Sequence, residues 1–295
     1  MKLRLRARPP FSFPAVVGSH GWARLAPFVV DQDGGDLMRV EQLASGRVVE
    51  LQITGAIDGV AVASDAVLDE GEWSEIEAKV TWMLGLDQDL SAFYALAREE
   101  PKLAHVEGQA QGRLLRSPTL FEDVVKTILT TNTTWSGTIR MAEALASRFG
   151  APLPGDAARC AFPAPEQLAS ADEGILRSEA RLGYRAPYVL ALARAVASGD
   201  FDLEALKSTN LETAELRRRL LALKGVGEYA AANLLMLLER YDFLPVDSWA
   251  LKLVSHEWHD GAPVSRAEVE AAFAHWGQWK GLAYWFWDWS DLASA

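Results

Sequence analysis

The sequence predicts an α+β fold that is predominantly helical, with a small antiparallel sheet before the helices. Between Pro14 and Ser64, the runs AVVG, FVV, LMRVEQL, RVVELQI and GVAVA are rich in β-branched residues, and ASG at residues 44–46 suits a hairpin turn. From Glu72 onward the apolar residues recur at helical spacing. We therefore assign residues 1–71 to an N-terminal antiparallel β domain and residues 72–295 to a helical region.

Local signals place three helices in the helical region. Ser117 followed by Pro118 is a typical helix start, because serine caps a helix and proline is tolerated at its first position. That helix should end near residues 130–134. Two further helices are predicted at residues 136–149 and 185–198.

The composition limits the kind of protein. A hydrophobic content of 49% in 295 residues can bury a substantial core. The single cysteine, Cys160, excludes an internal disulfide, a zinc site made of cysteines and a four-cysteine iron–sulfur cluster. The basic N-terminus runs into Pro9-Pro10 without a continuous apolar segment, and no stretch has the roughly 18 apolar residues of a membrane helix. We expect a cytoplasmic protein with no membrane partner.

The net charge of −11 counts at first against a nucleic-acid partner, because phosphate binding depends on Lys and Arg. The charge is unevenly spread, however. Residues 65–100 contain ten acidic residues and only two basic ones, Lys79 and Arg98. Most of the negative charge belongs to one segment, so another face remains able to meet DNA.

A Gly-Val-Gly turn joins two helix-forming runs in LALKGVGEYAAANLL, residues 221–235. Glycine at positions 225 and 227 accepts positive φ and lets a phosphate approach the N–H groups that open the second helix. Two interpretations stay open on the turn alone. It is either an ordinary connection between core helices or a turn that grips one DNA phosphate.

Asp247 precedes another helix-forming run, in LPVDSWALKLV. It is a good N-cap, which is a structural role. It could also be a carboxylate that stabilises the positive charge built up when an N-glycosidic bond breaks, and that orients the attacking water. Taken alone, Asp247 favours the N-cap interpretation.

The order of these two features resembles the helix-hairpin-helix DNA glycosylase superfamily, which has a hairpin L-x-G-V-G-x-x-x-A, a helix, and then proline, a hydrophobic residue and aspartate. SPTLFEDVVKTILTTNTTWSGTIRMAEALASRFG is similar to the family's early helix, wedge loop and following helix. LGYRAPYVLALARAVASG and WGQWKGLA resemble segments of the 8-oxoguanine branch. The similarity covers about residues 72–291, and the N-terminal sheet resembles the extra domain of the 8-oxoguanine and alkylbase (3-methyladenine type II) branches.

The resemblance implies two helical subdomains with the helix-hairpin-helix motif between them, one formed by residues 118–240 and the other by residues 72–117 plus 241–295. It also implies site residues. The implied roles are Asp247 as the catalytic carboxylate; Gly225, Val226, Gly227 and Glu228 as a backbone phosphate clamp; Asn132 as the side chain inserted where the flipped base was; and the carbonyls of Leu221, Leu223 and Val226 as ligands of a structural Na⁺ or K⁺. Asn132 could instead be a polar residue that ends a helix.

The largest departure from the family pattern is Tyr229, which stands where bifunctional members have the lysine that forms a Schiff base. A tyrosine hydroxyl cannot form that adduct, so the nucleophile is expected to be water. An aromatic residue here is similar to the alkylbase branch, where flat rings stack on positively charged alkylated purines. Tyr284 and Asp288 fall on the closing helix where the 8-oxoguanine branch has its base-contacting residues. We expect Tyr229, Tyr284 and Asp288 at the base pocket.

We therefore expect a monomeric, monofunctional DNA glycosylase of base excision repair, associated with the bacterial nucleoid. It would act on double-stranded DNA with a damaged base, of which an alkylated purine is the expected substrate. No cofactor is needed for the chemistry, and no iron–sulfur cluster is expected. Alternatives are a glycosylase with lyase activity through another lysine such as Lys252, an oxidised-purine (8-oxoguanine type) glycosylase, and a non-catalytic damaged-DNA-binding protein.

Overall fold

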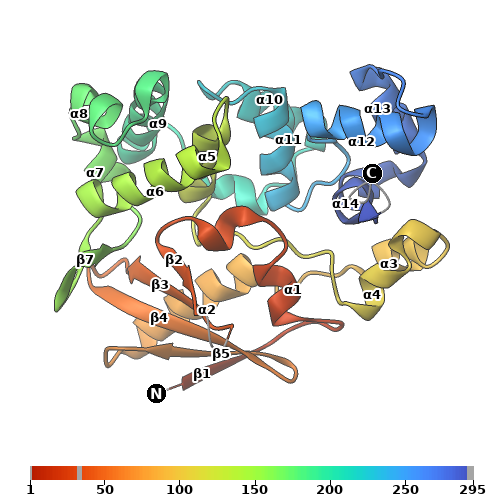
Figure 1. Cartoon of the computed structure of the whole chain (residues 1–295). Coiled ribbons are helices and arrows are strands. Elements are labelled where there is room, and N and C mark those ends of the chain that lie inside the picture. The colour runs from red at the N-terminus through yellow and green to blue at the C-terminus, as the bar shows by residue number, and fades with distance from the viewer. Residues whose placement is uncertain (1, 32–34, 291–295) are drawn as a thin grey trace. The chain divides into compact units, whose positions relative to one another are not determined.

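The computed structural model describes residues 2–31 and 35–290 (Figure 1). Contacts between Cα atoms divide the chain into two compact units. The predicted boundaries at residues 71, 117 and 240 stay a prediction, and residues 291–295 lie outside the described residues. The first unit consists of Met1–Gln88, Arg113–Thr209 and Leu223–Gly225, and the second of Asp89–Gly112, Asn210–Ala222 and Val226–Ala295.

The first unit contains a five-stranded antiparallel sheet in the order β1-β5-β4-β3-β2 (Figure 1). Alternate residues of β4, namely Val49, Leu51 and Ile53, are buried, as expected when one sheet face covers a core. The predicted N-terminal antiparallel sheet is therefore confirmed, with β1 added before the predicted strands. The strands are β1 (Lys2–Arg6), β2 (Phe28–Val30), β3 (Leu37–Gln42), β4 (Val48–Ala56) and β5 (Gly59–Ser64).

One predicted strand is wrong, because AVVG belongs to the helix α1 (Phe13–Val17) and its C-cap. The Ser12 hydroxyl accepts a hydrogen bond from the Ala15 N–H at 3.3 Å, and Pro14 lies in the first turn. These helix-start signals outweigh the strand preference of the two valines.

The helices of the first unit follow the sheet. The first predicted helix begins later than Ser117, at Leu120, because Thr119 caps it and the Ser117 N–H donates to Asp123 Oδ1 at 2.9 Å instead. The other two predicted helices are confirmed as α6 and α9. The elements are α2 (Glu70–Leu84), α5 (Leu120–Thr130), α6 (Trp135–Phe149), β6 (Pro152–Leu153), β7 (Asp156–Cys160), α7 (Pro165–Ala169), α8 (Glu173–Ser178) and α9 (Ala186–Ala197), with 3₁₀ turns at Gly21–Arg24, Gly183–Arg185 and Glu204–Ser208.

The described part of the second unit contains helices and turns. Helix α10 packs against α11, and α12 packs against α13. No helix in the described ranges is long and apolar enough to cross a membrane. The elements are α3 (Ser91–Ala97), α4 (His105–Gly108), α10 (Thr213–Leu221), α11 (Glu228–Leu237), α12 (Ser248–His259), α13 (Arg266–Ala272) and α14 (Lys280–Phe286), with 3₁₀ turns at Pro101–Leu103 and Ala274–Trp279.

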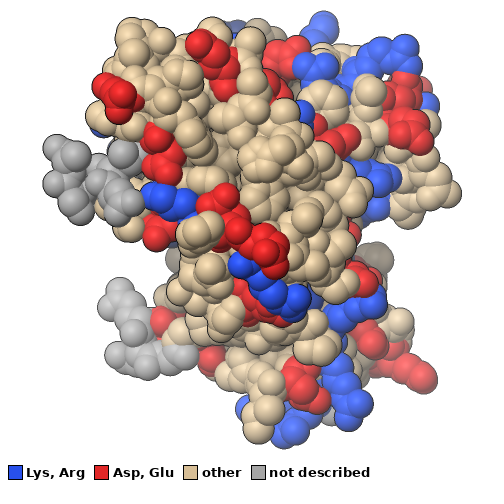
Figure 2. Space-filling view, turned by 90° about the vertical axis from the view of Figure 1, so that its right-hand side faces the viewer, with Lys and Arg blue, Asp and Glu red and all other residues tan. Residues whose placement is uncertain are grey.

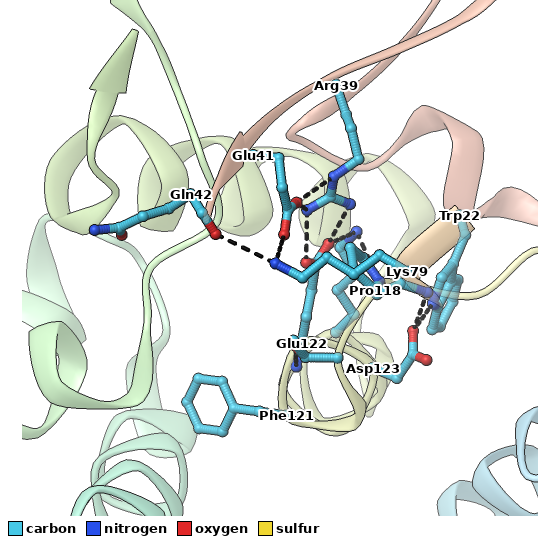
Figure 3. A network of polar contacts seen from close by, with 12 residues as sticks. Trp22, Arg39, Glu41, Gln42, Lys79, Pro118, Phe121, Glu122 and Asp123 are labelled. Atoms are coloured by element: carbon cyan, nitrogen blue, oxygen red, sulfur yellow. Dashed lines mark hydrogen bonds and ion pairs between the residues drawn. The ribbon is translucent and has the colours of Figure 1, made fainter. Parts of the chain in front are cut away.

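A buried network of charges joins the sheet to α5 inside the first unit (Figure 3). Arg39 of β3 donates to Glu122 of α5 at 3.0 Å, and the Lys126 ammonium lies 2.6 Å from the same carboxylate. Burial alone would raise the pKa of Glu122, but Arg39 and Lys126 lower it to about 2. The network fixes α5, whose C-terminal end leads directly into Asn132.

Candidate active site

Asp247 occupies the N-cap position of α12, with extended backbone angles of φ −122° and ψ −171°. Its Oδ1 accepts a hydrogen bond from the Ala250 N–H at 2.8 Å. Its Oδ2 accepts no hydrogen bond from any residue in the described ranges. The preceding residue, Val246, is buried and its carbonyl accepts from Arg266 Nη1 at 3.0 Å. The N-cap backbone and the bond to Oδ1 therefore fix Asp247, and Oδ2 of the half-buried carboxylate is available to a ligand.

The negative charge of Asp247 affects the pKa of two tyrosines in the second unit. Tyr229 is the second residue of α11, and Tyr284 lies on α14 with 8% of its surface exposed. Burial raises the pKa of both hydroxyls, and the negative charge of Asp247 raises it further. The structure thus brings three of the predicted site residues together in the second unit, with both hydroxyls kept neutral as hydrogen-bond donors.

An aromatic cluster holds the Tyr284 ring. The ring meets Phe273 edge to face, with ring centroids 5.6 Å apart, and lies 6.1 Å from Trp289. Phe273 in turn contacts the rings of Trp258 and Trp287. Packing against these rings therefore sets the orientation of Tyr284.

The prediction that Asp288 lies on the closing helix together with Tyr284 is wrong. Helix α14 ends at Phe286, and Asp288 lies beyond it, exposed. Hydrogen bonds from the Ser290 hydroxyl and from the Ser290 N–H, the latter at 2.9 Å, lower the pKa of its carboxyl. Among the described residues, no hydrogen bond, ion pair or ring contact joins Asp288 to Asp247, Tyr229 or Tyr284, and its pocket role stays a prediction.

The Gly-Val-Gly turn lies between α10 and α11, as predicted. Gly225 has φ +88°, and a Cβ there would lie 2.8 Å from Tyr188 Cδ2, so only glycine fits. Gly227 is different: its φ is −94°, and the expected positive φ is wrong. A Cβ at Gly227 would meet nothing within 4 Å, so the space beside this residue is open. Gly227 is the N-cap of α11 and supplies no side chain to its N–H groups.

The three carbonyls predicted to bind a monovalent cation come from both units, Leu223 from the first and Leu221 and Val226 from the second. Those of Leu221, Leu223 and Val226 accept no hydrogen bond from another described residue. Carbonyl oxygens without other partners are suitable ligands for Na⁺ or K⁺. Elsewhere in the described ranges, no group of three or more His, Cys, Asp or Glu side chains could hold a metal ion. The carbonyl cation site stays a proposal.

Asn132 follows α5 in the first unit, with its side chain exposed and a left-handed backbone at φ +46°. Sequence reasoning missed its neighbours. Asn132 Nδ2 lies 3.3 Å from the Tyr184 hydroxyl, and Arg185 donates to the carbonyls of Asn132 and Thr131. The guanidinium of Arg185 also lies 4.5 Å over the Tyr184 ring, which is 44% exposed. The signal in the sequence was the pair Tyr184-Arg185 in LGYRAPY, to which no role was assigned.

Lys252, the alternative lysine for lyase chemistry, is exposed on α12. Its Nζ lies 5.3 Å over the ring of Trp249, which is itself 56% exposed. Its amine is thus engaged with an exposed ring. No described hydrogen bond or ion pair connects Lys252 with Asp247.

The sequence matches the HhH-GPD superfamily base excision DNA repair proteins over residues 125–278. It is 25% identical over 187 residues to a DNA-3-methyladenine glycosylase of Bacillus subtilis (strain 168), a match covering 62% of this chain and 61% of the relative. The chain therefore matches less than two thirds of that relative's length.

Two of the solved structures that share the fold are glycosylases. A 3-methyladenine DNA glycosylase from Archaeoglobus fulgidus gives a TM-score of 0.78 at 21% identity and covers 100% of both chains. An 8-oxoguanine glycosylase/lyase of Clostridium acetobutylicum was solved with dsDNA containing cytosine opposite 8-oxoG. It gives a TM-score of 0.69 at 19% identity, and the match covers 94% of this chain and 93% of that chain.

The family match spans more than half of the chain and includes Asn132, the Gly-Val-Gly turn and Asp247. The shared fold agrees with the predicted class, mostly helical with an N-terminal antiparallel sheet. The chain belongs to the HhH-GPD superfamily of base excision DNA repair proteins.

Proposed function

We propose that this protein is a monofunctional DNA glycosylase that hydrolyses the N-glycosidic bond of a damaged base, an alkylated purine, flipped out of double-stranded DNA. The observation that carries the proposal is the Asp247 carboxylate, with one oxygen used as a helix cap and the other without a hydrogen bond among the described residues. It lies beside two neutral tyrosines, one of which replaces the lysine of bifunctional relatives.

Asp247 would act on the sugar. Departure of the base builds positive charge on C1′, and a fixed carboxylate stabilises that charge and orients a water for attack. The Ala250 N–H holds the carboxylate in place before substrate arrives. The leaving purine takes the glycosidic electron pair, water adds to C1′ as the hydroxyl of the abasic sugar, and the proton that water releases passes to the Asp247 carboxylate and then to solvent.

Tyr229 and Tyr284 would form part of the base pocket. Their rings can stack on an electron-poor alkylated purine, whose positive charge is attracted to the face of an aromatic ring. Tyrosine hydroxyls are protonated near neutral pH, and the raised pKa values extend this to more alkaline pH, so each can donate a hydrogen bond to a purine nitrogen or oxygen. Neither supplies an amine, so the reaction ends at the abasic site.

DNA would be held by backbone as well as by side chains. On the face drawn in Figure 2, Lys and Arg side chains are interspersed with Asp and Glu and form no continuous basic surface. We assign the phosphate clamp to Gly225, Val226, Gly227 and Glu228, supported by the open space beside Gly227 and by the N–H groups of α11 that lack a side-chain cap. Asn132 would occupy the gap left by the flipped base. The enzyme would work as a monomer on nucleoid DNA, without a cofactor in the chemical step.

The test is base release from duplexes with single lesions: 3-methyladenine, 7-methylguanine, 1,N6-ethenoadenine, hypoxanthine or 8-oxoguanine. Abasic products are cleaved with alkali and counted against D247N. We expect release of at least one alkylated purine by the wild type and none by D247N. No release from any lesion, or equal release by D247N, would disprove the proposal. Trapping of a covalent DNA adduct by borohydride would show lyase chemistry instead.

A further inference from the structure

Arg217 of α10 forms an ion pair with Glu228, the first residue of α11. Its Nη2 donates to Glu228 Oε2. The guanidinium also lies 5.0 Å over the ring of Phe243, in the segment that leads from α11 to Asp247. Lys280 of α14 lies 5.6 Å over the same ring and pairs with Glu270 at 3.2 Å. Arg217 therefore contacts the Glu228 carboxylate and the Phe243 ring, and that ring also contacts the Lys280 ammonium.

Glu228 is poorly placed for a protein that binds phosphate at this helix end. Its carboxylate is exposed and belongs to the first turn of α11, whose N–H groups lack a side-chain cap. A negative side chain suits an empty helix N-terminus but repels a phosphate brought to the same place. Its described side-chain contact is with Arg217 on the neighbouring helix and not with the N–H groups of α11.

We infer that Arg217 makes the start of α11 accessible to a DNA phosphate by neutralising the Glu228 carboxylate and holding it toward α10. The inference rests on the proposed phosphate clamp and adds a positioning residue to it. Arg217 acts through Glu228 and contributes no hydrogen bond to the DNA. Without Arg217, the carboxylate turns toward the uncapped N–H groups and competes with the phosphate for them.

The chain offers a matched control for the loss of one positive charge. Arg218 is the next residue of α10, and it pairs within its own helix with Glu215. R218M removes the same charge as R217M but leaves the Arg217–Glu228 pair intact. R217K keeps the charge at position 217, and methionine at 217 keeps an apolar stem against Phe243.

The experiment measures the dissociation constant of the full chain for a duplex with a tetrahydrofuran abasic analogue, by fluorescence anisotropy at low and moderate salt. The proteins are wild type, R217M, R217K, E228Q, R217M/E228Q and R218M, each checked by thermal unfolding. We expect R217M to bind about fivefold more weakly, because a carboxylate near a phosphate is only partly screened. R217K should stay near wild type, E228Q should bind as tightly or more tightly, and R218M should change little. The double variant should bind like E228Q.

The double-mutant cycle decides the inference. Equal weakening by R217M in both backgrounds, with a shallower salt dependence, would mean that Arg217 itself contacts phosphate and would overturn the proposal. Unchanged binding by R217M would overturn it as well. Base release is measured on the same preparations. If the wild type releases the base but the effects of R217M and E228Q are additive, only this inference is refuted. If the wild type neither binds the duplex nor releases a base, the proposed function is refuted as well.

Discussion

The Arg39 guanidinium and the Glu122 carboxylate are joined by two hydrogen bonds in the interior of the first unit, Nη1 to Oε1 at 3.3 Å and Nη2 to Oε2 at 3.0 Å (Figure 3). The pair connects β3 of the N-terminal sheet with α5. Both side chains are almost fully buried. The attachment of the sheet to the helix before Asn132 is therefore electrostatic as well as apolar.

Replacement of Arg39 by methionine should destabilise the protein strongly. It leaves the Glu122 and Glu41 carboxylates buried with less compensation, and removing one partner of a buried ion pair costs about 3–5 kcal/mol. The measurement is urea unfolding at pH 7.5. R98M is the control, because Arg98 and Glu107 form an exposed pair whose loss should hardly change the midpoint. Similar midpoints for R39M and wild type would contradict the prediction.

Asp123 should make stability depend on pH. Burial raises the pKa of its carboxyl to about 6, although the Ser117 and Trp22 N–H groups both donate to Oδ1. In the unfolded chain this group loses its proton near pH 4, so between about pH 4 and 6 the folded state binds more protons. The free energy of unfolding contributed by Asp123 therefore falls as the pH rises through this window.

Asp123→Asn should remove that contribution, because the amide keeps the acceptor and does not titrate. We expect the stability of D123N relative to wild type to increase between pH 4 and 6.5, by up to about 3 kcal/mol from a shift of this size. Chemical unfolding at closely spaced pH values measures it. Parallel stability curves for the two proteins would show that Asp123 does not titrate in this range.

The sequence allowed the local parts of the site to be predicted. Asp247 as N-cap and the Gly-Val-Gly turn depend on short-range signals, and both lie where they were expected. The proximity of Tyr284 to Asp247 depends on α14 packing in the second unit, and only the family resemblance indicated it. The prediction that Asp288 lies on the closing helix failed because no local signal marks the end of α14 at Phe286. Tyr184 was missed because its contact with Asn132 joins residues 52 positions apart.

Asp247 can be tested for its two roles separately. D247N retains a good helix cap, so its thermal stability should stay near wild type while base release falls by at least about a hundredfold. D247A should lose base release and also about 1 kcal/mol of stability, because the Ala250 N–H loses its acceptor. Single-turnover excision and thermal unfolding give the two readouts. Residual activity in D247N close to that of wild type would leave Asp247 as a cap alone.

Tyr284→Phe should reduce base release without weakening DNA binding. The variant keeps the ring against Phe273 and loses only the hydroxyl, whose pKa is raised by burial and by the charge of Asp247. Loss of one hydrogen bond to the base predicts about a tenfold lower single-turnover rate, with unchanged affinity for an abasic duplex. Y94F is the control, since the Tyr94 hydroxyl in the same unit donates to the Gln111 carbonyl at 2.7 Å, away from the predicted site residues. Equal losses in Y284F and Y94F would place Tyr284 in the core alone.

Asn132 and Tyr184 should matter most when the damaged base is paired. The Tyr184 hydroxyl lies 3.3 Å from the Asn132 amide nitrogen, and the exposed Tyr184 ring lies under the Arg185 guanidinium. We therefore expect the two side chains to support together the gap left by a flipped base. Opening the stack costs a few kcal/mol in a paired duplex and much less in a single strand. N132A and Y184A should therefore release the base about tenfold more slowly from duplex, with a smaller loss from single-stranded DNA of the same sequence. Y184F, which keeps the ring, should fall between them and wild type. Equal loss on both substrates would assign the two residues to general DNA binding, and no loss on either would leave Asn132 as the polar end of α5.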